Sequence, residues 1–159
     1  MLNDTTLITT RAFVGGEWID ADSGKTFAVV NPADGSIVGE VADLGVGETR
    51  LRSRLRQQCR RTGRQRRTKN GERSLRRWYD PMLANKKDLA LIMTMEMGKP
   101  IGEARGEVVH AANFIDGVAE ESKRARGEVT PTNDSKKRLL VSKQPVGVVA
   151  AITLRNDSP

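Results

Sequence analysis

The sequence predicts an α/β protein in which short β-strands come first, helices follow, and a buried strand comes last. Up to residue 45, runs rich in Val, Ile, Phe and Trp alternate with turn-forming residues, which is typical of strands. From Leu75 onward, apolar residues recur three or four positions apart, which is typical of helices. The continuous apolar run over 146–152 is typical of a strand covered on both faces in a parallel sheet. Because that strand has no parallel partner in the sequence, we expect the fold to be incomplete.

The first strands are expected to form a hairpin over residues 12–14 and 17–19. Gly15 and Gly16 lie between them, and glycine supplies the positive φ angles that a two-residue turn needs. A second strand pattern covers 27–30 and resumes over 37–41. Between these two runs, Asn31-Pro32-Ala33-Asp34-Gly35 predicts a turn, since Pro fixes φ and Gly permits a left-handed residue.

Two helical patterns follow. The first has its apolar positions at Leu75, Trp78, Met82, Leu89, Ile92, Met93 and Met97. Pro81 is expected to interrupt this helix, and Gly98 to end it. Pro100 fits the first turn of the next helix, which we expect to end near Gly127. Its predicted apolar stripe consists of Ile101, Ala104, Val108, Ala111, Ile115 and Ala119. A polar linker over 130–136 then leads to strands over 139–141 and 146–152.

The basic residues are concentrated in one segment. Residues 51–77 carry a net charge of +11, whereas the rest of the chain is mildly acidic. Three explanations are open: the segment is an arm that binds nucleic acid, it is a patch that contacts an anionic surface, or its sequence does not belong to the fold around it. It contains no aromatic residue that could stack on bases. We expect the basic stretch beyond Cys59, up to residue 70, to be disordered. The alternative function is that of a non-enzymatic fragment that binds nucleic acid or another anion through residues 51–77, and adventitious binding of nucleic acid is expected in any case.

The numbers of cysteines and histidines and the lengths of the apolar runs exclude several kinds of site and a membrane location. One cysteine, Cys59, excludes an internal disulfide framework, and one histidine, His110, leaves too few soft ligands for a zinc site, so no metal site is expected. His110 is expected to be partly buried beside the helical stripe. No apolar run is long enough to cross a bilayer, and no secretory signal is present, so we expect a cytoplasmic protein without membrane contact.

Five segments in order resemble a known family. They are Phe13-Val14-Gly15-Gly16-Glu17-Trp18, Asn31-Pro32-Ala33-Asp34-Gly35, Arg77-Trp78-Tyr79, Met95-Glu96-Met97-Gly98-Lys99-Pro100 and Lys143-Gln144-Pro145-Val146-Gly147-Val148. Together they resemble the N-terminal part of NAD(P)-dependent aldehyde dehydrogenases, most of all the succinate-semialdehyde dehydrogenase group. The resemblance implies β-hairpins, helices and the first strand of a Rossmann-like cofactor domain.

The resemblance also implies a division of the chain. Residues 1–127 would be the N-terminal strands and helices of the cofactor-binding domain, and 128–145 part of an oligomerisation hairpin. Residues 146–159 would be the first cofactor-domain strand and a truncated loop. Within the first part, 51–70 is an aberrant basic stretch where the family has an Ala-rich helix. Since alanine codons read one nucleotide out of register often give arginine, a compensated frameshift is one hypothesis for its origin.

The implied activity is oxidation of succinate semialdehyde, or a similar aldehyde, to the carboxylate, with NAD or NADP as cofactor and a homo-oligomer as assembly. In the family, a loop asparagine stabilises the oxyanion, and Asn156 matches it. Arg155 and Asn156 match loop positions beside the cofactor, although Leu154 and Arg155 replace the family's Pro and Trp. The family's Cys nucleophile and general base have no counterpart in these residues, and Cys59 lies far upstream of the nucleophile's place. We therefore expect the isolated chain to be inactive.

Overall fold

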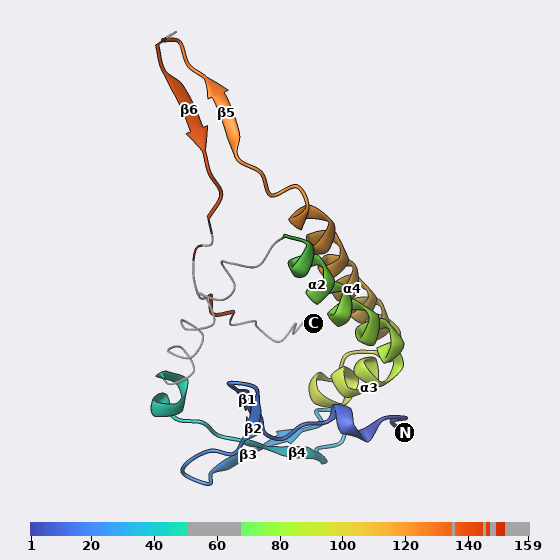
Figure 1. Cartoon of the computed structure of the whole chain (residues 1–159). Helices are drawn as coiled ribbons and strands as arrows, with labels where there is room; N and C mark the ends of the chain where they lie inside the picture. Colours follow the sequence, from blue (N-terminus) through green and yellow to red (C-terminus); the bar gives the residue numbers. More distant parts are fainter. Residues whose placement is uncertain (51–67, 135, 145, 147–148, 152–159) are drawn as a thin grey trace.

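The computed structural model of the chain describes residues 1–50, 68–134, 136–144, 146 and 149–151. It consists of three two-stranded antiparallel hairpins and a group of helices (Figure 1). The two N-terminal hairpins lie at one end of the helices, and the third hairpin projects from the other end (Figure 1). None of the helices in these described residues is long and apolar enough to span a membrane.

The first hairpin joins β1 (Ala12–Val14) to β2 (Glu17–Ile19), as the sequence predicts. Gly15 and Gly16 form its turn with φ angles of 64° and 103°, a region that residues with a Cβ avoid. Phe13 pairs with Trp18 across the strands, and their ring centroids lie 5.0 Å apart. This aromatic pair fixes the register of a very short hairpin.

The second hairpin joins β3 (Thr26–Val30) to β4 (Ile37–Ala42), which extends each predicted strand by one residue. The predicted turn closes it, with the Gly35 N–H donating to the Asn31 carbonyl and the Asn31 N–H to the Ser36 carbonyl. Pro32 of this turn contacts the end of a helix: a Cβ at Gly98 would lie 2.9 Å from its ring. Gly98 also has φ 74°, so both conformation and space require glycine there.

Helix α2 (Thr68–Ala84) continues through Pro81, so the predicted interruption at this residue is wrong. Pro81 lies in the last turn, where its missing N–H leaves one unpaired carbonyl a turn earlier and the helix is about to end anyway. The break comes instead at Asn85, whose backbone and side-chain N–H groups both donate to the Pro81 carbonyl. Helix α3 (Lys86–Met97) starts directly after it and ends at Gly98, as predicted.

Helix α4 (Ile101–Ser122) ends five residues before Gly127 and is therefore shorter than predicted. The third hairpin then joins β5 (Glu128–Pro131) to β6 (Arg138–Val141). Residues 130 and 131, which the sequence analysis assigned to a linker, therefore belong to a strand. The predicted strand over 146–152 lies partly outside the described residues, and residues 146 and 149–151 are not in a strand.

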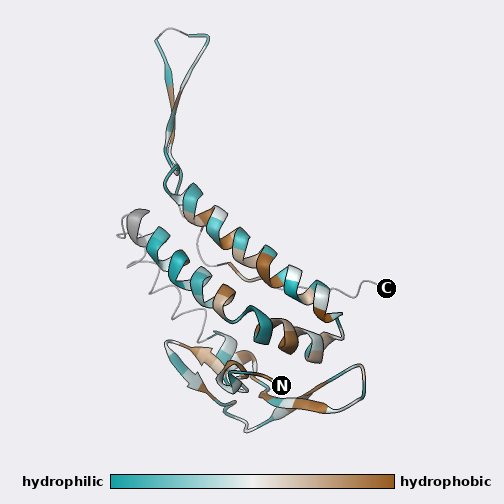
Figure 2. Ribbon diagram, turned by 90° about the vertical axis from the view of Figure 1, so that its right-hand side faces the viewer, coloured by the Kyte–Doolittle hydropathy of each residue, from teal (hydrophilic) through white to brown (hydrophobic). Residues whose placement is uncertain are grey.

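The core is made of small side chains where α3 meets α4. Ala90, Ala104 and Val108 are buried, and Leu89 and Met93 pack against them. Alanine at such a contact allows two helices to approach closely, because little side chain separates the backbones. Apolar positions also remain along the outside of the helices and hairpins, so this core covers only part of the apolar surface (Figure 2).

The buried helix faces differ in part from the predicted stripes. In α4 the buried positions are Ala104, Val108, Ala112 and Ala119, whereas Ile101 and Ala111 are exposed. In α2 the side chain of Trp78 is 60% exposed, while Leu75 and Tyr79 are partly buried. Each helix packs against two neighbours, α2 and α3 in the case of α4. The buried arc is therefore set by the position of both partners and not by apolarity alone.

The N-terminal segment is tied to α3 by a buried carboxylate. Asp88, 5% exposed, accepts hydrogen bonds from the Asn3 N–H at 3.1 Å, the Asn3 amide side chain at 2.9 Å and the Asp4 N–H at 2.9 Å. Asp4 in turn accepts a hydrogen bond from the Thr6 N–H and so caps the short 3₁₀-helix η1 (Thr5–Leu7). The donated N–H groups, that of Asn3 foremost, lower the pKa of Asp88.

Replacing Asp88 by alanine is expected to release residues 1–7 from α3, because the backbone donors of Asn3 and Asp4 lose their acceptor. Hydrogen exchange at these two amides should accelerate. The pKa of Asp88 in the folded chain lies below its ordinary value of 3.8. The anchor is therefore fully present above pH 3.8 and is lost as the pH falls through the folded-state pKa. The control is Asp80→Ala, at an exposed position of α2. If the Asn3 and Asp4 amides exchanged at the same rate in both variants, Asp88 would not anchor the N-terminal segment.

Candidate functional site

The residues predicted to touch substrate or cofactor fall at the end of the chain. Arg155 and Asn156 lie outside the described residues, as do Cys59 and most of the basic segment. His110 is described, and the expectation that it is partly buried is wrong: it is exposed on α4. It follows buried Val108 by two positions, which places it about 200° around the helix from the core.

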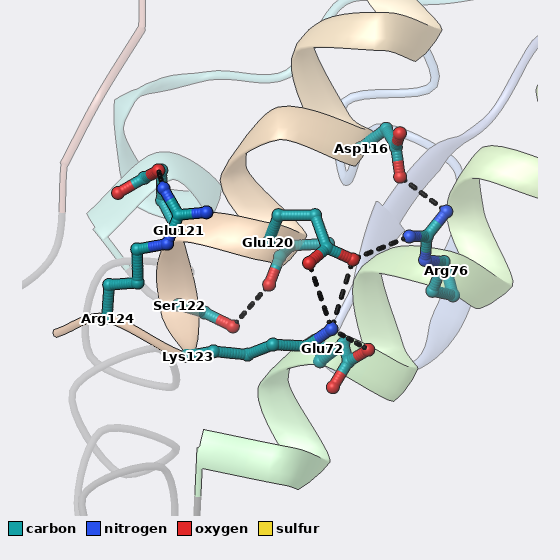
Figure 3. A network of polar contacts seen from close by, with 9 residues as sticks. Glu72, Arg76, Asp116, Glu120, Glu121, Ser122, Lys123 and Arg124 are labelled. Carbon is teal, nitrogen blue, oxygen red and sulfur yellow. Dashed lines mark hydrogen bonds and ion pairs between the residues drawn. The ribbon is translucent and has the colours of Figure 1, made fainter.

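A network of charges joins α2 to α4 (Figure 3). Arg76 of α2 forms ion pairs with Asp116 and, at 2.8 Å, with Glu120, both on α4. Beyond the end of α4, Lys123 binds Glu72 of α2 at 2.9 Å and Glu120 at 3.0 Å. Glu120 is thus shared by two cations, Arg76 from α2 and Lys123 from just beyond the end of α4.

The pKa values of the network residues move in the directions that keep all the groups charged. A hydrogen bond to Glu120 raises the pKa of Arg76, and one to Glu72, followed by Glu120, raises that of Lys123. Lys123 first and Arg76 second lower the pKa of Glu120. These partly exposed pairs therefore persist across the neutral range, and their role is to orient the helices.

The network uses one of the cations that make residues 51–77 basic. Arg76 is held by two carboxylates, so its positive charge is already paired within the chain. Arg73 and Arg77, on the same helix, are exposed. The rest of the segment's arginines precede residue 68 and lie outside the described residues.

Replacing Arg76 by glutamine is expected to lower the melting temperature by loosening α2 from α4. The Asp116 Oδ1 atom, which is buried and accepts no hydrogen bond from the described residues, would lose its ion pair as well. Arg77→Gln, at the exposed neighbouring position, is the matched control and should change the melting temperature less. Salt screens half-exposed ion pairs, so 1 M NaCl should reduce the difference in melting temperature between the two variants. If this difference stays the same in 1 M NaCl, the arginine stem stabilises the helices by packing and not by charge.

Between α3 and α4 lies an apolar groove of about 410 Å³. Its apolar lining consists of Met82, Leu89, Ile92, Met93, Met97, Val108 and Ala111, with Glu96 and Glu107 at its border. Its two carboxylates, Glu96 and Glu107, have no His, Cys, Ser or Thr beside them in the lining. No group of His, Cys, Asp and Glu in the described part of the chain could hold a metal ion. The groove is suited to packing against apolar side chains and not to chemistry.

The third hairpin is the other prominent apolar surface. Every residue of β5 and β6 is exposed, including Val129, Leu139 and Leu140, the last at 80%. At its base, Gly127 lies so close to β6 that a Cβ would be 2.6 Å from the Val141 carbonyl oxygen. The hairpin predicted within 128–145 is therefore present, and glycine is required at its base.

A further helix begins after Gly45, and its described residues are 46–50. The Glu48 carboxylate accepts hydrogen bonds from the Gly45 N–H and, at 2.9 Å, from the Asp22 N–H. Glu48 thus caps the helix N-terminus in the manner of a capping box. Neither Asp88 nor the Arg76 network was anticipated from sequence, because each depends on partners 40 or more positions away.

Comparison with known proteins identifies the architecture. Residues 18–156 match the model of the aldehyde dehydrogenase family. The chain is 45% identical over 152 residues to the glutarate-semialdehyde dehydrogenase of Pseudomonas putida. It is 43% identical, also over 152 residues, to the succinate-semialdehyde dehydrogenase [NADP(+)] of Escherichia coli. Both alignments cover 96% of this chain and 32% of the relative, so the chain spans about a third of the length of these curated relatives.

Solved structures share the fold. The succinate-semialdehyde dehydrogenase from Burkholderia pseudomallei matches 92% of this chain and 30% of its own with a TM-score of 0.86 and 44% identity. The aldehyde dehydrogenase from Brucella melitensis biovar abortus 2308 matches 91% of this chain and 30% of its own, with a TM-score of 0.86 and 43% identity. The predicted fold, a partial α/β piece from the N-terminal part of such an enzyme, is confirmed, and the chain belongs to the aldehyde dehydrogenase family.

Proposed function

We propose that these 159 residues form the N-terminal part of an enzyme that oxidises succinate semialdehyde, or a similar aldehyde, to the carboxylate. The observation that supports this is the identity of 43–45% to succinate- and glutarate-semialdehyde dehydrogenases over 96% of the chain. NAD or NADP, the cofactor type of the family, would accept the hydride. The single cysteine fits a reducing compartment, and we propose the cytoplasm.

Two residues are proposed to act at the reacting centre. The Asn156 amide would donate a hydrogen bond to the oxyanion that forms when the thiolate attacks the aldehyde, where such donors are most effective. Arg155 and Asn156 would also lie along the cofactor. Both proposals rest on the match of this loop to the family's sequence pattern.

The hairpin β5–β6 is proposed to contact another copy of the enzyme in a homo-oligomer. Its exposed Val129, Leu139 and Leu140 support this, because a two-stranded hairpin with apolar side chains on its surface is marginally stable when nothing covers it.

The 159 residues assayed alone are proposed to be inactive. Their single cysteine, Cys59, lies in the basic segment and not where the family has its nucleophile. The purified chain should form no NADH or NADPH from succinate semialdehyde, with each cofactor tested separately. Turnover by the sequence-verified chain would refute this proposal.

The proposed enzymatic role is tested with a chimera in which this chain replaces the matching N-terminal third of the Escherichia coli relative. We expect the chimera to fold and to oxidise succinate semialdehyde, since the replaced third shares 43% identity. Cys59→Ser in the chimera should leave the rate unchanged. A chimera that is folded by circular dichroism but inactive would contradict the proposal.

A further inference from the structure

Residues 3–8, which we call the N-terminal strap, cross the junction between α3 and the two N-terminal hairpins. At one end, the Asp88 carboxylate of α3 accepts hydrogen bonds from the first two residues of the strap. Just past the other end, the Thr10 carbonyl accepts a hydrogen bond from the Ala42 N–H at the end of β4, at 2.9 Å. The strap is therefore attached to a helix by a side chain and to a hairpin by backbone.

The strap is tied internally by its own hydrogen bonds. The Asp4 carboxylate accepts hydrogen bonds from the Thr6 N–H at 2.9 Å and from the Thr6 hydroxyl at 2.6 Å. The Ile8 N–H donates to the Thr5 carbonyl at 3.3 Å and closes the 3₁₀ turn. Thr9, by contrast, forms no hydrogen bond within the described residues. The strap can therefore move as one unit, with Thr9 as its hinge.

A cavity of about 280 Å³ lies against the strap. Leu7 and Ile8 of the strap line one side of it. The other apolar walls come from both hairpins and from α3, and they are Trp18, Val29, Val38, Val41 and Ile92. Close-packed protein interiors contain few voids larger than a water molecule, so Leu7 and Ile8 make fewer contacts here than they would in such a core. Packing holds the strap weakly, and the Asp88 hydrogen bonds supply much of its attachment.

We propose that the N-terminal strap is a lid that opens and closes over this cavity as one unit, turning at Thr9 and held closed by Asp88. Losing one hydrogen bond to a charged acceptor shifts an equilibrium by about tenfold or more. Because Asp88 accepts bonds from two strap residues, the open form is a minor population in the wild type and predominates when the carboxylate is removed. Opening makes Trp18 accessible from the cavity side.

A lid that moves as one unit couples its two ends. Weakening the strap at Asp88 uncovers the cavity, and weakening it at the cavity frees the amides bonded to Asp88, because coupling between two sites is reciprocal. If the first residues instead frayed independently, each change would act only where it is made. Variants at the two ends distinguish these cases.

The first test follows Trp18 in the full 159-residue chain. Trp78→Phe removes the other of the two tryptophans, which is 60% exposed on α2. In this background, Asp88→Ala should shift the Trp18 emission to longer wavelength and increase its quenching by acrylamide. Asp80→Ala, at an exposed position of α2, is the control and should change neither. A Trp18 signal that is the same in both variants would overturn the proposal.

The second test starts from the cavity with Leu7→Ala, which leaves the Asp88 carboxylate in place and so serves even if Asp88→Ala does not fold. Hydrogen exchange at the Asn3 and Asp4 amides, measured by NMR, should become about threefold faster or more, because the strap loses apolar contact. Val46→Ala, at a position 69% exposed, is the control and should leave this exchange unchanged.

The Ala42 amide shows whether the hinge is correctly placed. It is bonded to Thr10, beyond the hinge, so its exchange should stay unchanged in Leu7→Ala and Asp88→Ala. Faster exchange at Ala42 would mean that the hairpin itself opens, which would overturn the proposal. Exchange at Asn3 that is unaffected by Leu7→Ala would overturn it as well.

Discussion

Replacing Ala104 by aspartate is expected to lower the free energy of unfolding by roughly 3–5 kcal/mol, the cost of a buried charge without a partner. Ala104 is fully buried between α3 and α4, where Ala90 and Val108 are its neighbours in the core. Small domains have stabilities of about 5–15 kcal/mol, so this change approaches the whole of the stability. Urea unfolding followed by circular dichroism measures it.

The control is Asn113→Asp, which places an aspartate on the same helix at an exposed position outside the α3–α4 groove. Its effect should stay within about 0.5 kcal/mol, which is usual for surface changes. If the two variants unfolded at the same urea concentration, the contact between α3 and α4 would not be the core of the chain.

Replacing Asn156 by alanine in the active chimera is expected to lower kcat by about 10²–10³-fold, the usual cost of losing one oxyanion donor. KM for the aldehyde should change little, because the charge that Asn156 would stabilise develops only in the transition state. Steady-state kinetics with succinate semialdehyde separate the two parameters.

Asn133→Ala, the same substitution in the exposed turn of the third hairpin, is the control and should leave kcat within twofold or so of the chimera. A kcat unchanged by Asn156→Ala would contradict the oxyanion role. A rise in KM alone would instead indicate that Asn156 binds the substrate in its ground state.

The local elements were predictable from sequence where a few adjacent residues decide them. Gly15-Gly16 placed the first hairpin, the Asn31–Gly35 segment placed the second turn, and Gly98 ended α3. Each depends on the φ angles that glycine and proline allow within a few positions. Pro81 was misjudged because the cost of proline depends on its place in the helix, and here it falls in the last turn.

The faces of the helices were predicted less well. Trp78 and His110 were assigned to apolar or partly buried positions, yet both are exposed. Periodicity finds a helix but does not show which neighbours pack on it, and α4 packs against both α2 and α3. The proposed catalytic asparagine came from the family pattern, and its position lies outside the described residues.

The sequence by itself determined the α/β class, the family and the positions of most turns, because these follow from local stereochemistry and from motifs in order along the chain. Only the tertiary structure decided that Asp88 holds the N-terminal segment and that Arg76 and Lys123 share Glu120 between α2 and α4. It also decided which face of α4 is buried. These features join residues far apart in the chain, and their energies depend on distance and burial, which arise when the helices pack.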